Sequence, residues 1–167
     1  MGRVLSFDVG IRNLAYCHTS DGTIEDWGVL NVQGKDLGHV ANAVVNTLDQ
    51  HFAGVAFDQV LIENQPVMKN PTMKSVQMLI YSYFVMCREV GMVPIGEIRL
   101  IAASRKNKLC DAILGADPEG RSYKKNKDRA IETTRRLLRD QPARWSTVFE
   151  AHAKRDDLAD AFLQGRA

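Results

Sequence analysis

The chain has 167 residues, 45% of them hydrophobic, which suffices for the core of one domain, and we predict a single domain over residues 1–167. No apolar run approaches membrane-spanning length and no secretory signal begins the chain, so we expect no membrane partner. Residues 1–63 hold three Lys/Arg against eight Asp/Glu, whereas the remainder holds nineteen against twelve. This asymmetry suits a nucleic-acid enzyme, although chance clustering on a solvated surface gives the same pattern.

The three cysteines are widely spaced and odd in number. Cys17, Cys87 and Cys110 form neither a CxxC pair nor a zinc-ligand pattern. We therefore expect reduced, buried thiols in an intracellular, reducing compartment.

Short apolar runs bounded by turn residues predict five strands. The first run ends at Asp8, and Asp21-Gly22 occupies the turn between the second and third runs, as in a hairpin. The predicted strands cover residues 4–8, 14–19, 24–32, 59–63 and 93–101. The pattern predicts an α/β fold with a mixed sheet, in which an antiparallel hairpin meander precedes parallel strands flanked by helices.

Apolar residues at helical spacing predict helices over residues 37–52, 71–90, 125–139 and 154–163. Asn70-Pro71 begins the longest of them with an N-cap and a proline at the first helical position. This helix is apolar on more than one face, so it lies either inside the monomer or partly at a subunit interface. Residues 104–114 form a short segment without an assigned type, and a polar loop follows over residues 115–123.

Two carboxylates end buried-looking strands. Asp8 begins Asp8-Val9-Gly10, which is either ordinary turn chemistry or the first ligand of a metal site. Glu63 repeats the arrangement at the end of the strand over residues 59–63. Sites of open α/β sheets gather at the carboxyl ends of strands, so the pair favours a shared cation more than either acid alone.

The last predicted helix adds two more carboxylates. Asp157 and Asp160 lie three residues apart, so both project from one face, where like charges destabilise the helix unless a cation lies nearby. Asp156 with Asp160 is an alternative pair. We prefer Asp157 because Asp156 suits the N-cap or the first turn, at the positive end of the helix.

Asp8, Glu63, Asp157 and Asp160 would form an all-oxygen site, which suits Mg²⁺ or Mn²⁺ better than zinc. Two such ions about 4 Å apart can bind one phosphodiester, one activating a water and the other stabilising the leaving 3′ oxygen. This set of residues predicts metal-dependent phosphodiester hydrolysis without a covalent intermediate.

Basic side chains provide candidate contacts to DNA phosphates, most densely in the helix over residues 125–139 and just before it. The same helix also carries Asp128 and Glu132, so an ordinary solvated surface helix is the alternative interpretation. The candidate DNA-binding residues are Arg12, Lys69, Lys74, Lys106, Lys108, Lys124, Lys125, Lys127 and Arg129.

Five segments carry a family resemblance that extends over nearly the whole chain. They are FDVGIRNLAY (7–16), IENQP (62–66), NPTMKSVQMLIYSYF (70–84), KKNKDRAIE (124–132) and KRDDLADAFLQ (154–164). Together they resemble the poxvirus and mitochondrial branch of RuvC-type Holliday junction resolvases. The resemblance implies a ribonuclease H-like fold and a homodimer that cuts opposing strands of a four-way DNA junction, leaving a 5′-phosphate that can be ligated.

The resemblance also implies Mg²⁺ or Mn²⁺ at the active site, two ions per site, with Asp8, Glu63, Asp157 and Asp160 as catalytic and metal-binding acids. It makes the helix from Pro71 the dimer helix. The expected interface residues are Met73, Val76, Ile80, Tyr83 and Phe84.

Three alternatives compete with a resolvase. Another ribonuclease H-like nuclease could act on other branched DNA or on RNA–DNA hybrids, but cellular ribonucleases H carry their second acid on the first long helix, where this chain has only Asp49. An actin-like ATPase would need a second phosphate loop and a glycine-rich motif, so no nucleotide cofactor is expected. A non-catalytic junction-binding protein is disfavoured because all four acids are present. Host cytoplasm is the expected location of a viral protein, and a mitochondrion is the weaker expectation.

Overall fold

The computed structural model describes residues 2–66, 70–116 and 122–167. Five strands form one sheet in the order β3-β2-β1-β4-β5, with β1 at its centre. β1, β2 and β3 pair antiparallel, whereas β4 pairs parallel with both β1 and β5. The strands are β1 (Arg3–Asp8), β2 (Asn13–Ser20), β3 (Thr23–Asn31), β4 (Phe57–Glu63) and β5 (Ile95–Ile101). The predicted mixed α/β sheet, a meander followed by parallel strands, is confirmed.

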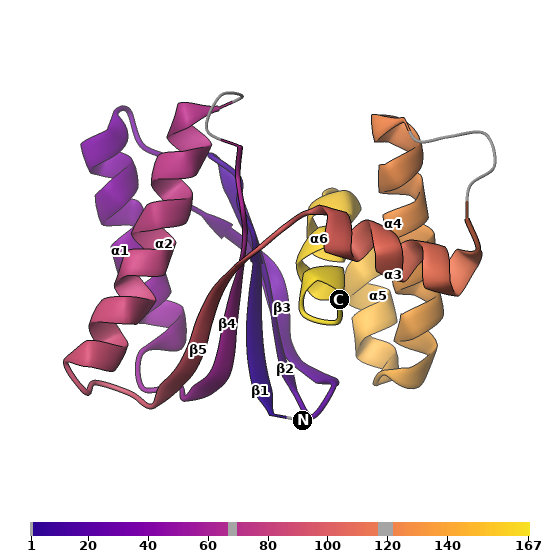
Figure 1. Ribbon diagram of the computed structural model, residues 1–167, viewed down its shortest axis with the longest axis horizontal. Coiled ribbons are helices and arrows are strands. Elements are labelled where there is room, and N and C mark those ends of the chain that lie inside the picture. Colours follow the sequence, from indigo (N-terminus) through magenta and orange to yellow (C-terminus); the bar gives the residue numbers. More distant parts are fainter. Residues whose placement is uncertain (1, 67–69, 117–121) are drawn as a thin grey trace.

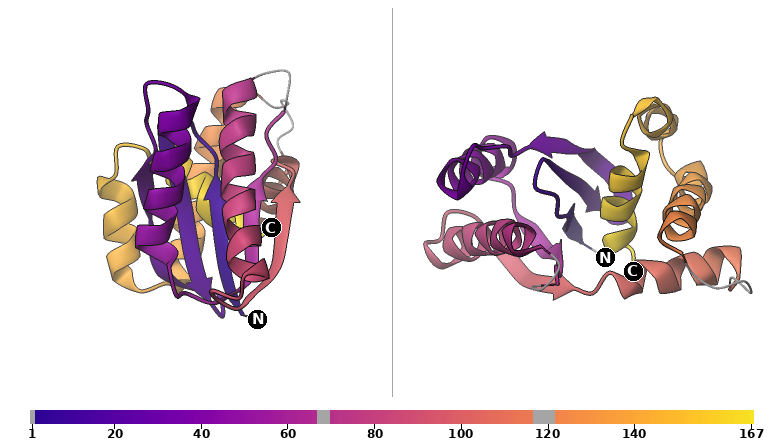
Figure 2. Two further views of the ribbon diagram at one scale, coloured as in Figure 1. Left: turned by 90° about the vertical axis from the view of Figure 1, so that its left-hand side faces the viewer. Right: turned by 90° about the horizontal axis from the view of Figure 1, so that it is seen from above.

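Helices cover both faces of this sheet. α1 and α2 lie on one face, and α6 lies on the other with α3, α4 and α5 around it (Figures 1 and 2). The helices are α1 (Leu37–Phe52), α2 (Pro71–Glu89), α3 (Ser104–Leu114), α4 (Tyr123–Leu137), the 3-10 turn η1 (Leu138–Asp140), α5 (Ala143–Ala151) and α6 (Arg155–Gln164). Within the described parts of the chain, no helix combines the length and hydropathy needed to span a bilayer.

Aromatic side chains fill the layer between the sheet and helices α1 and α2. Phe7 of the central strand lies 5.9 Å from the Phe52 ring of α1 and 5.8 Å from the Phe84 ring of α2, measured between centroids. α1 packs on this layer because Val40, Val44, Leu48 and Phe52, four residues apart, are all buried.

The opposite layer attaches α6 to the sheet. Trp27 of β3 stacks on Phe149 of α5 with ring centroids 5.4 Å apart, and its indole donates to the Leu158 carbonyl at 3.0 Å. The buried Ser6 hydroxyl of β1 donates to the Ala161 carbonyl at 2.7 Å. These two bonds join the backbone of α6 to a central and an outer strand, so the position of α6 relative to Asp8 is well defined.

The structure differs from the sequence-based predictions at several boundaries. The helix predicted over residues 125–139 begins earlier, at Tyr123, and ends as η1; the fifth strand begins at Ile95. α5 was not predicted. Residues 117–121 of the predicted loop and the candidate Lys69 lie outside the described residues. All three cysteines are unpaired and buried, as predicted.

The predicted interface residues of α2 require a correction. Val76, Ile80, Tyr83 and Phe84 are buried in the monomer's own core, between α2, α1 and the sheet. A partner subunit could not contact them without unfolding that core. Met73 is half-buried and lines the acidic pocket described below.

Candidate active site

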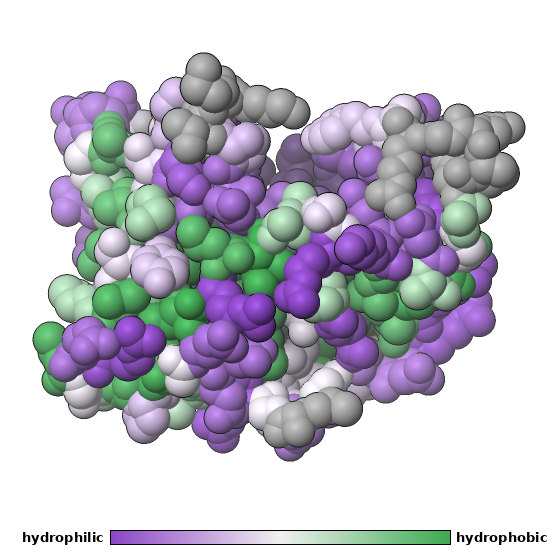
Figure 3. Space-filling model, viewed as in Figure 1, coloured by the Kyte–Doolittle hydropathy of each residue, from purple (hydrophilic) through white to green (hydrophobic). Residues whose placement is uncertain are grey.

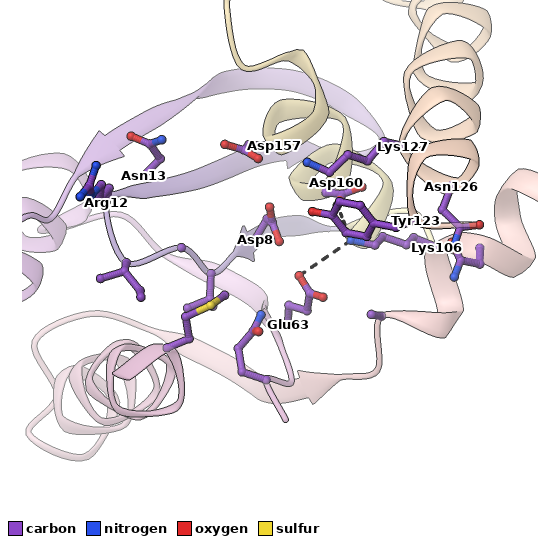
Figure 4. Close-up of a pocket in the computed structure, with 17 residues that line it drawn as sticks. Asp8, Arg12, Asn13, Glu63, Lys106, Tyr123, Asn126, Lys127, Asp157 and Asp160 are labelled. Carbon is purple, nitrogen blue, oxygen red and sulfur yellow. Dashed lines mark hydrogen bonds and ion pairs between the residues drawn. The ribbon is translucent and has the colours of Figure 1, made fainter. Parts of the chain in front are cut away.

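The four predicted acids line one open pocket at the carboxyl ends of β1 and β4. Asp8 comes from β1, Glu63 from β4, and Asp157 and Asp160 from α6 (Figure 4). The cavity has a volume of about 480 Å³. It opens at the upper edge of the molecule, where the surface is hollowed between the α2 side and the α3–α4 side (Figure 3). The expected convergence of these acids is therefore present.

A tight turn after β1 positions Asp8. The chain reverses at residues 9–12 and returns as β2, so that Asp8 pairs with Ala15 across the ladder. A Cβ atom on Gly10 would lie 2.2 Å from the Asn13 carbonyl oxygen, so this turn admits only glycine. The Asp-x-Gly pattern therefore both forms the turn and positions the Asp8 carboxylate.

A buried glutamine supports the segment after Glu63. The Gln77 side-chain oxygen, in α2, accepts from the Gln65 amide at 2.7 Å and from the Lys74 ammonium at 3.2 Å. Lys74 also donates to the Asn64 side chain at 2.9 Å. α2 therefore fixes the course of the chain just after Glu63, and Lys74 serves this support rather than lining the pocket.

The start of α6 separates its acids by role. Asp157 and Asp160 line the pocket, whereas Asp156 forms an ion pair with Lys127 of α4. Burial opposes the charge of Asp156, but the hydrogen bond and the charge of Lys127, together with backbone hydrogen bonds, lower the pKa of Asp156 overall. Asp156 lies in the first turn, as predicted, while the N-cap position belongs to Lys154. The geometry favours Asp157 over Asp156 as a pocket ligand.

Lys106 of α3 lies among the acids. Its ammonium is 2.5 Å from an Asp160 carboxylate oxygen and 3.8 Å from one of Glu63, and the Lys106 and Glu63 side chains are each only 12% exposed. Burial opposes its charge, but Asp160, Glu63 and Asp8 together raise the pKa of Lys106 above the ordinary value. Lys106 therefore stays protonated and partly neutralises the cluster.

The surroundings of the three aspartates in the pocket raise their pKa values. Burial, a hydrogen bond with Glu63, and the negative charges of Glu63 and Asp160 raise the pKa of Asp8 well above its usual value. Burial also raises the pKa of Asp160, although Lys106 partly offsets it, and burial with the charge of Asp156 raises that of Asp157. Several anions held together in one pocket leave it short of positive charge.

The donor set fits a hard divalent cation. Carboxylate oxygens are the ligands that Mg²⁺ and Mn²⁺ prefer, and the excess of buried negative charge would be relieved by one. Among the described residues, no three His, Cys, Asp or Glu side chains are grouped closely enough to hold a metal as they stand. The Lys106 ammonium, drawn between Glu63 and Asp160, takes part of the space into which these carboxylates would turn (Figure 4).

Only some of the candidate DNA-binding residues reach this pocket. Arg12, Lys106 and Lys127 line it. Lys108 and Lys124 are exposed on α3 and α4. Lys125 is half-buried at the start of α4, and Arg129 instead pairs with Asp111 at 3.1 Å and donates to the Gly115 carbonyl.

Sequence patterns did not single out several residues that build the site. Ser6 and Gln77 are small or neutral and act through buried hydrogen bonds, so no local pattern reveals them. Tyr123, Asn107 and Asn126 line the pocket beside the basic residues. For Tyr123 and Asn126, the available sequence signal was that an aromatic residue and an asparagine lie within the basic stretch 122–129.

Comparison with known proteins places this chain. The family described as Poxvirus A22 protein matches residues 3–165. The chain belongs to this family. A relative in Acanthamoeba polyphaga mimivirus, an uncharacterized protein, is 33% identical over 132 residues, which are 73% of this chain and 31% of that protein. The chain thus spans about a third of the mimivirus relative's length.

Solved structures with the same architecture are more distant in sequence. The yeast mitochondrial Holliday junction resolvase Ydc2 aligns over 98% of this chain and 77% of its own with a TM-score of 0.70 at 17% identity. Thermus thermophilus RuvC in complex with a Holliday junction substrate aligns over 98% and 90% with a TM-score of 0.55 at 14% identity. These likenesses confirm the ribonuclease H-like fold of the RuvC type for this member of the family.

Proposed function

We propose that this protein is a divalent-metal-dependent endonuclease that resolves four-way DNA junctions by paired phosphodiester hydrolysis. The convergence of Asp8, Glu63, Asp157 and Asp160 in one pocket beside basic side chains carries the proposal. The resolvase folds of Ydc2 and RuvC support the choice of a branched DNA substrate. Duplex or RNA–DNA hybrid cleavage has no comparable observation in its favour.

The pocket's own residues divide the work of such a reaction. We propose that two ions of Mg²⁺ or Mn²⁺ bind in the pocket. When bound, they would activate the attacking water and stabilise the leaving 3′ oxygen. Asp8 and Glu63 would hold the ions from the sheet, and Asp157 and Asp160 from α6. Arg12 and Lys127 lie where they can hold the strand's phosphates. Lys108 of α3 and Lys124 of α4 are exposed and could extend these contacts.

Lys106 has two roles in this proposal. It holds the acids together in the free protein through its contacts to Asp160 and Glu63. If the carboxylates turned toward a bound cation, the same ammonium would be free to stabilise the negative charge that develops on the phosphate in the transition state.

Cleavage of a synthetic four-way junction tests the proposal. We expect cuts in two opposing strands of the junction when Mg²⁺ or Mn²⁺ is present, and no comparable cleavage of a plain duplex or an RNA–DNA hybrid. Asp157→Asn is expected to reduce the rate at least about a thousandfold, because several kcal/mol of charge stabilisation depend on the metal.

Asp156→Asn is the matched control, since it removes an identical carboxylate one residue away. It is expected to reduce the rate by no more than about tenfold, because Asp156 supports only a partly exposed ion pair with Lys127. Equal losses in both variants would contradict the assignment of Asp157. Hybrid cleavage as fast as junction cleavage would contradict the proposed substrate.

A homodimer would supply the two active sites that paired cuts need. We propose that it forms through the outward side of α2. Met78 and Met86, two turns apart, are exposed there, and Leu100 of β5 is also exposed. Hydrophobic residues gather over the α2 and β5 side of the surface in Figure 3. Methionine side chains suit such a contact because they adapt their shape.

Charged substitutions on this side test the dimer. The double variant with Met78→Lys and Met86→Lys is expected to sediment or scatter light as a monomer at micromolar concentration, whereas wild type is expected to be a dimer. Val148→Lys, at an exposed apolar residue of α5, serves as the control. A monomeric wild type would refute the proposal, and a dimeric double variant would move the interface elsewhere.

A further inference from the structure

Tyr123 stands apart from the other aromatic residues of the chain. Every Phe and Trp is buried, Tyr16 and Tyr83 are buried and Tyr81 is half-buried, yet Tyr123 is 77% exposed. It is the first residue of α4, whose N-cap is Ser122. That helical position has no requirement for an aromatic ring, so the fold gives no reason to expose one there.

The exposed ring faces the candidate active site. Tyr123 lines the same pocket as the four acids, on the wall formed by α3 and α4 (Figure 4). The Lys127 ammonium lies 4.9 Å from its ring centroid, and Lys127 is itself paired with Asp156. This cation–π contact places the Lys127 ammonium over one face of the Tyr123 ring. With this much of the side chain exposed, ring surface remains free for another planar group.

Asn126 lies one turn further along α4 and lines the same wall. Among the described residues, its side-chain amide has no hydrogen-bond partner, and only its backbone N–H is bonded, to the Ser122 carbonyl. Residues three apart project from the same side of a helix. A free amide, with a donating NH₂ group and an accepting oxygen side by side, therefore lies next to the exposed ring.

We propose that Tyr123 stacks on an unpaired nucleobase of the strand being cut, and that Asn126 hydrogen-bonds the edge of that base. The inference rests on the proposed junction cleavage and specifies its substrate contact. A base inside a duplex has both faces covered by its neighbours, so only an unstacked base can offer a face to Tyr123. Unstacking costs least for a base that is not held in a continuous duplex, so a branch point favours it.

The arrangement assigns the two residues different effects. Stacking is tolerant of base identity, because every base has an aromatic face, so Tyr123 contributes affinity for branch-point DNA in general. The Asn126 amide complements particular patterns of donors and acceptors, so it contributes preference among bases next to the cut. Tyr123 and Asn126 are thus positioning and specificity residues, not acids or bases.

Binding to a four-way junction that carries 2-aminopurine at the crossover tests Tyr123 without cleavage, in EDTA. Wild type is expected to quench the fluorescence of the probe by stacking. Tyr123→Ala is expected to leave the probe bright and to raise the dissociation constant roughly 5- to 100-fold. Tyr123→Trp is expected to restore both. Tyr123→Ala that quenches and binds as wild type does would overturn the stacking contact.

Four junctions that differ only in the nucleotide at the crossover test Asn126. The kcat/KM of wild type is expected to differ among them, and Asn126→Ala is expected to reduce that spread to less than about threefold. Asn107→Ala, which removes another pocket-lining amide, from α3, is expected to keep the wild-type spread. Equal rates for wild type on all four, or an unchanged spread in Asn126→Ala, would overturn base recognition by Asn126.

These outcomes separate this inference from the proposed function. If wild type cuts junctions and the Tyr123 variants bind and quench as it does, the stacking inference fails while the nuclease proposal holds. If wild type quenches the probe but cuts nothing, the nuclease proposal fails while the binding contact holds.

Discussion

An Asp8→Asn variant is expected to lose junction cleavage by at least about a thousandfold while unfolding at a higher temperature than wild type in the absence of divalent metal. The two effects have one cause. Asp8 lies in the pocket against Glu63 and Asp160, so its charge is unfavourable until a cation arrives. Amide replacement removes that charge and with it the proposed metal ligand. A gain of about 1 kcal/mol corresponds to a rise of roughly 2–4 °C for a chain of this size.

The pH dependence of this gain follows from the raised pKa. The folded protein holds the Asp8 proton more tightly than the unfolded chain, so ionisation costs stability as the pH rises through and above the ordinary value of 3.8. The difference in melting temperature between Asp8→Asn and wild type is expected to be largest at pH 7–8 and to vanish well below pH 4. Calorimetry in EDTA over this range measures it.

Asp156→Asn is the matched control for stability. Its carboxylate is paired with Lys127, and its pKa is lowered, so its ionised form favours the folded state. Replacing it is expected to lower the melting temperature slightly at neutral pH, the opposite sign to Asp8→Asn. A lower melting temperature for Asp8→Asn at pH 7–8 would mean that its carboxylate is already compensated in the metal-free protein.

The strand-end acids could be predicted from sequence because the signal is local. An apolar run followed at once by a carboxylate and turn residues identifies both Asp8 and Glu63. The choice of Asp157 over Asp156, which the structure favours, also followed from a local rule, the preference for acids in the first helical turn. Short-range chemistry thus located the acids that the proposed site uses.

Features that depend on long-range packing were missed or misplaced. α5 has only nine residues, and its buried Trp145 and Phe149 face α6 and β3, so its reason for being helical lies in distant elements. The many-sided apolar pattern of α2 could not distinguish its core side from its outer side. Phe84 packs on Phe7 of the sheet, which only the tertiary structure reveals.

The placement of Lys106 among the acids has the same origin. Its sequence neighbourhood is a short basic run, Arg105-Lys106-Asn107-Lys108, in which nothing sets Lys106 apart. α3 follows β5 after a two-residue connection, and this geometry turns Lys106 toward Glu63 and Asp160. A lysine predicted only as a DNA contact is therefore part of the charge balance of the pocket.

Replacing Lys106 by methionine is expected to destabilise the metal-free protein by about 2 kcal/mol or more at pH 8. Methionine keeps much of the side-chain volume but removes the ammonium that, among the described residues, contacts both Glu63 and Asp160. Breaking a fully buried pair costs about 3–5 kcal/mol, and the open pocket reduces that figure. Lys106→Arg, which keeps the positive charge, is the control and is expected to lose clearly less.

The sign of the pH effect identifies the mechanism. The acids hold the pKa of Lys106 high, so its stabilising charge is present at every pH below its ordinary value of 10.5. Burial raises the pKa of its partner Asp160, however, so the Asp160 carboxylate ionises only as the pH rises above the ordinary aspartate value. The destabilisation by Lys106→Met is therefore expected to be small near pH 4 and to grow toward pH 8. Loss of stability that is equal at both pH values would indicate lost packing instead.

Divalent metal is expected to reverse this loss. In wild type, the Lys106 ammonium bonds to Asp160, so Mn²⁺ would have to compete with it for that carboxylate. In Lys106→Met no ammonium competes, so saturating Mn²⁺ is expected to raise the melting temperature of the variant more than that of wild type, and titration calorimetry is expected to give tighter binding. Cleavage by the variant is nevertheless expected to be slow, because the variant lacks the ammonium that we propose to stabilise the transition state. Weaker Mn²⁺ binding to Lys106→Met would contradict this account, because the lysine would then support metal binding instead of competing with the ion for the carboxylates.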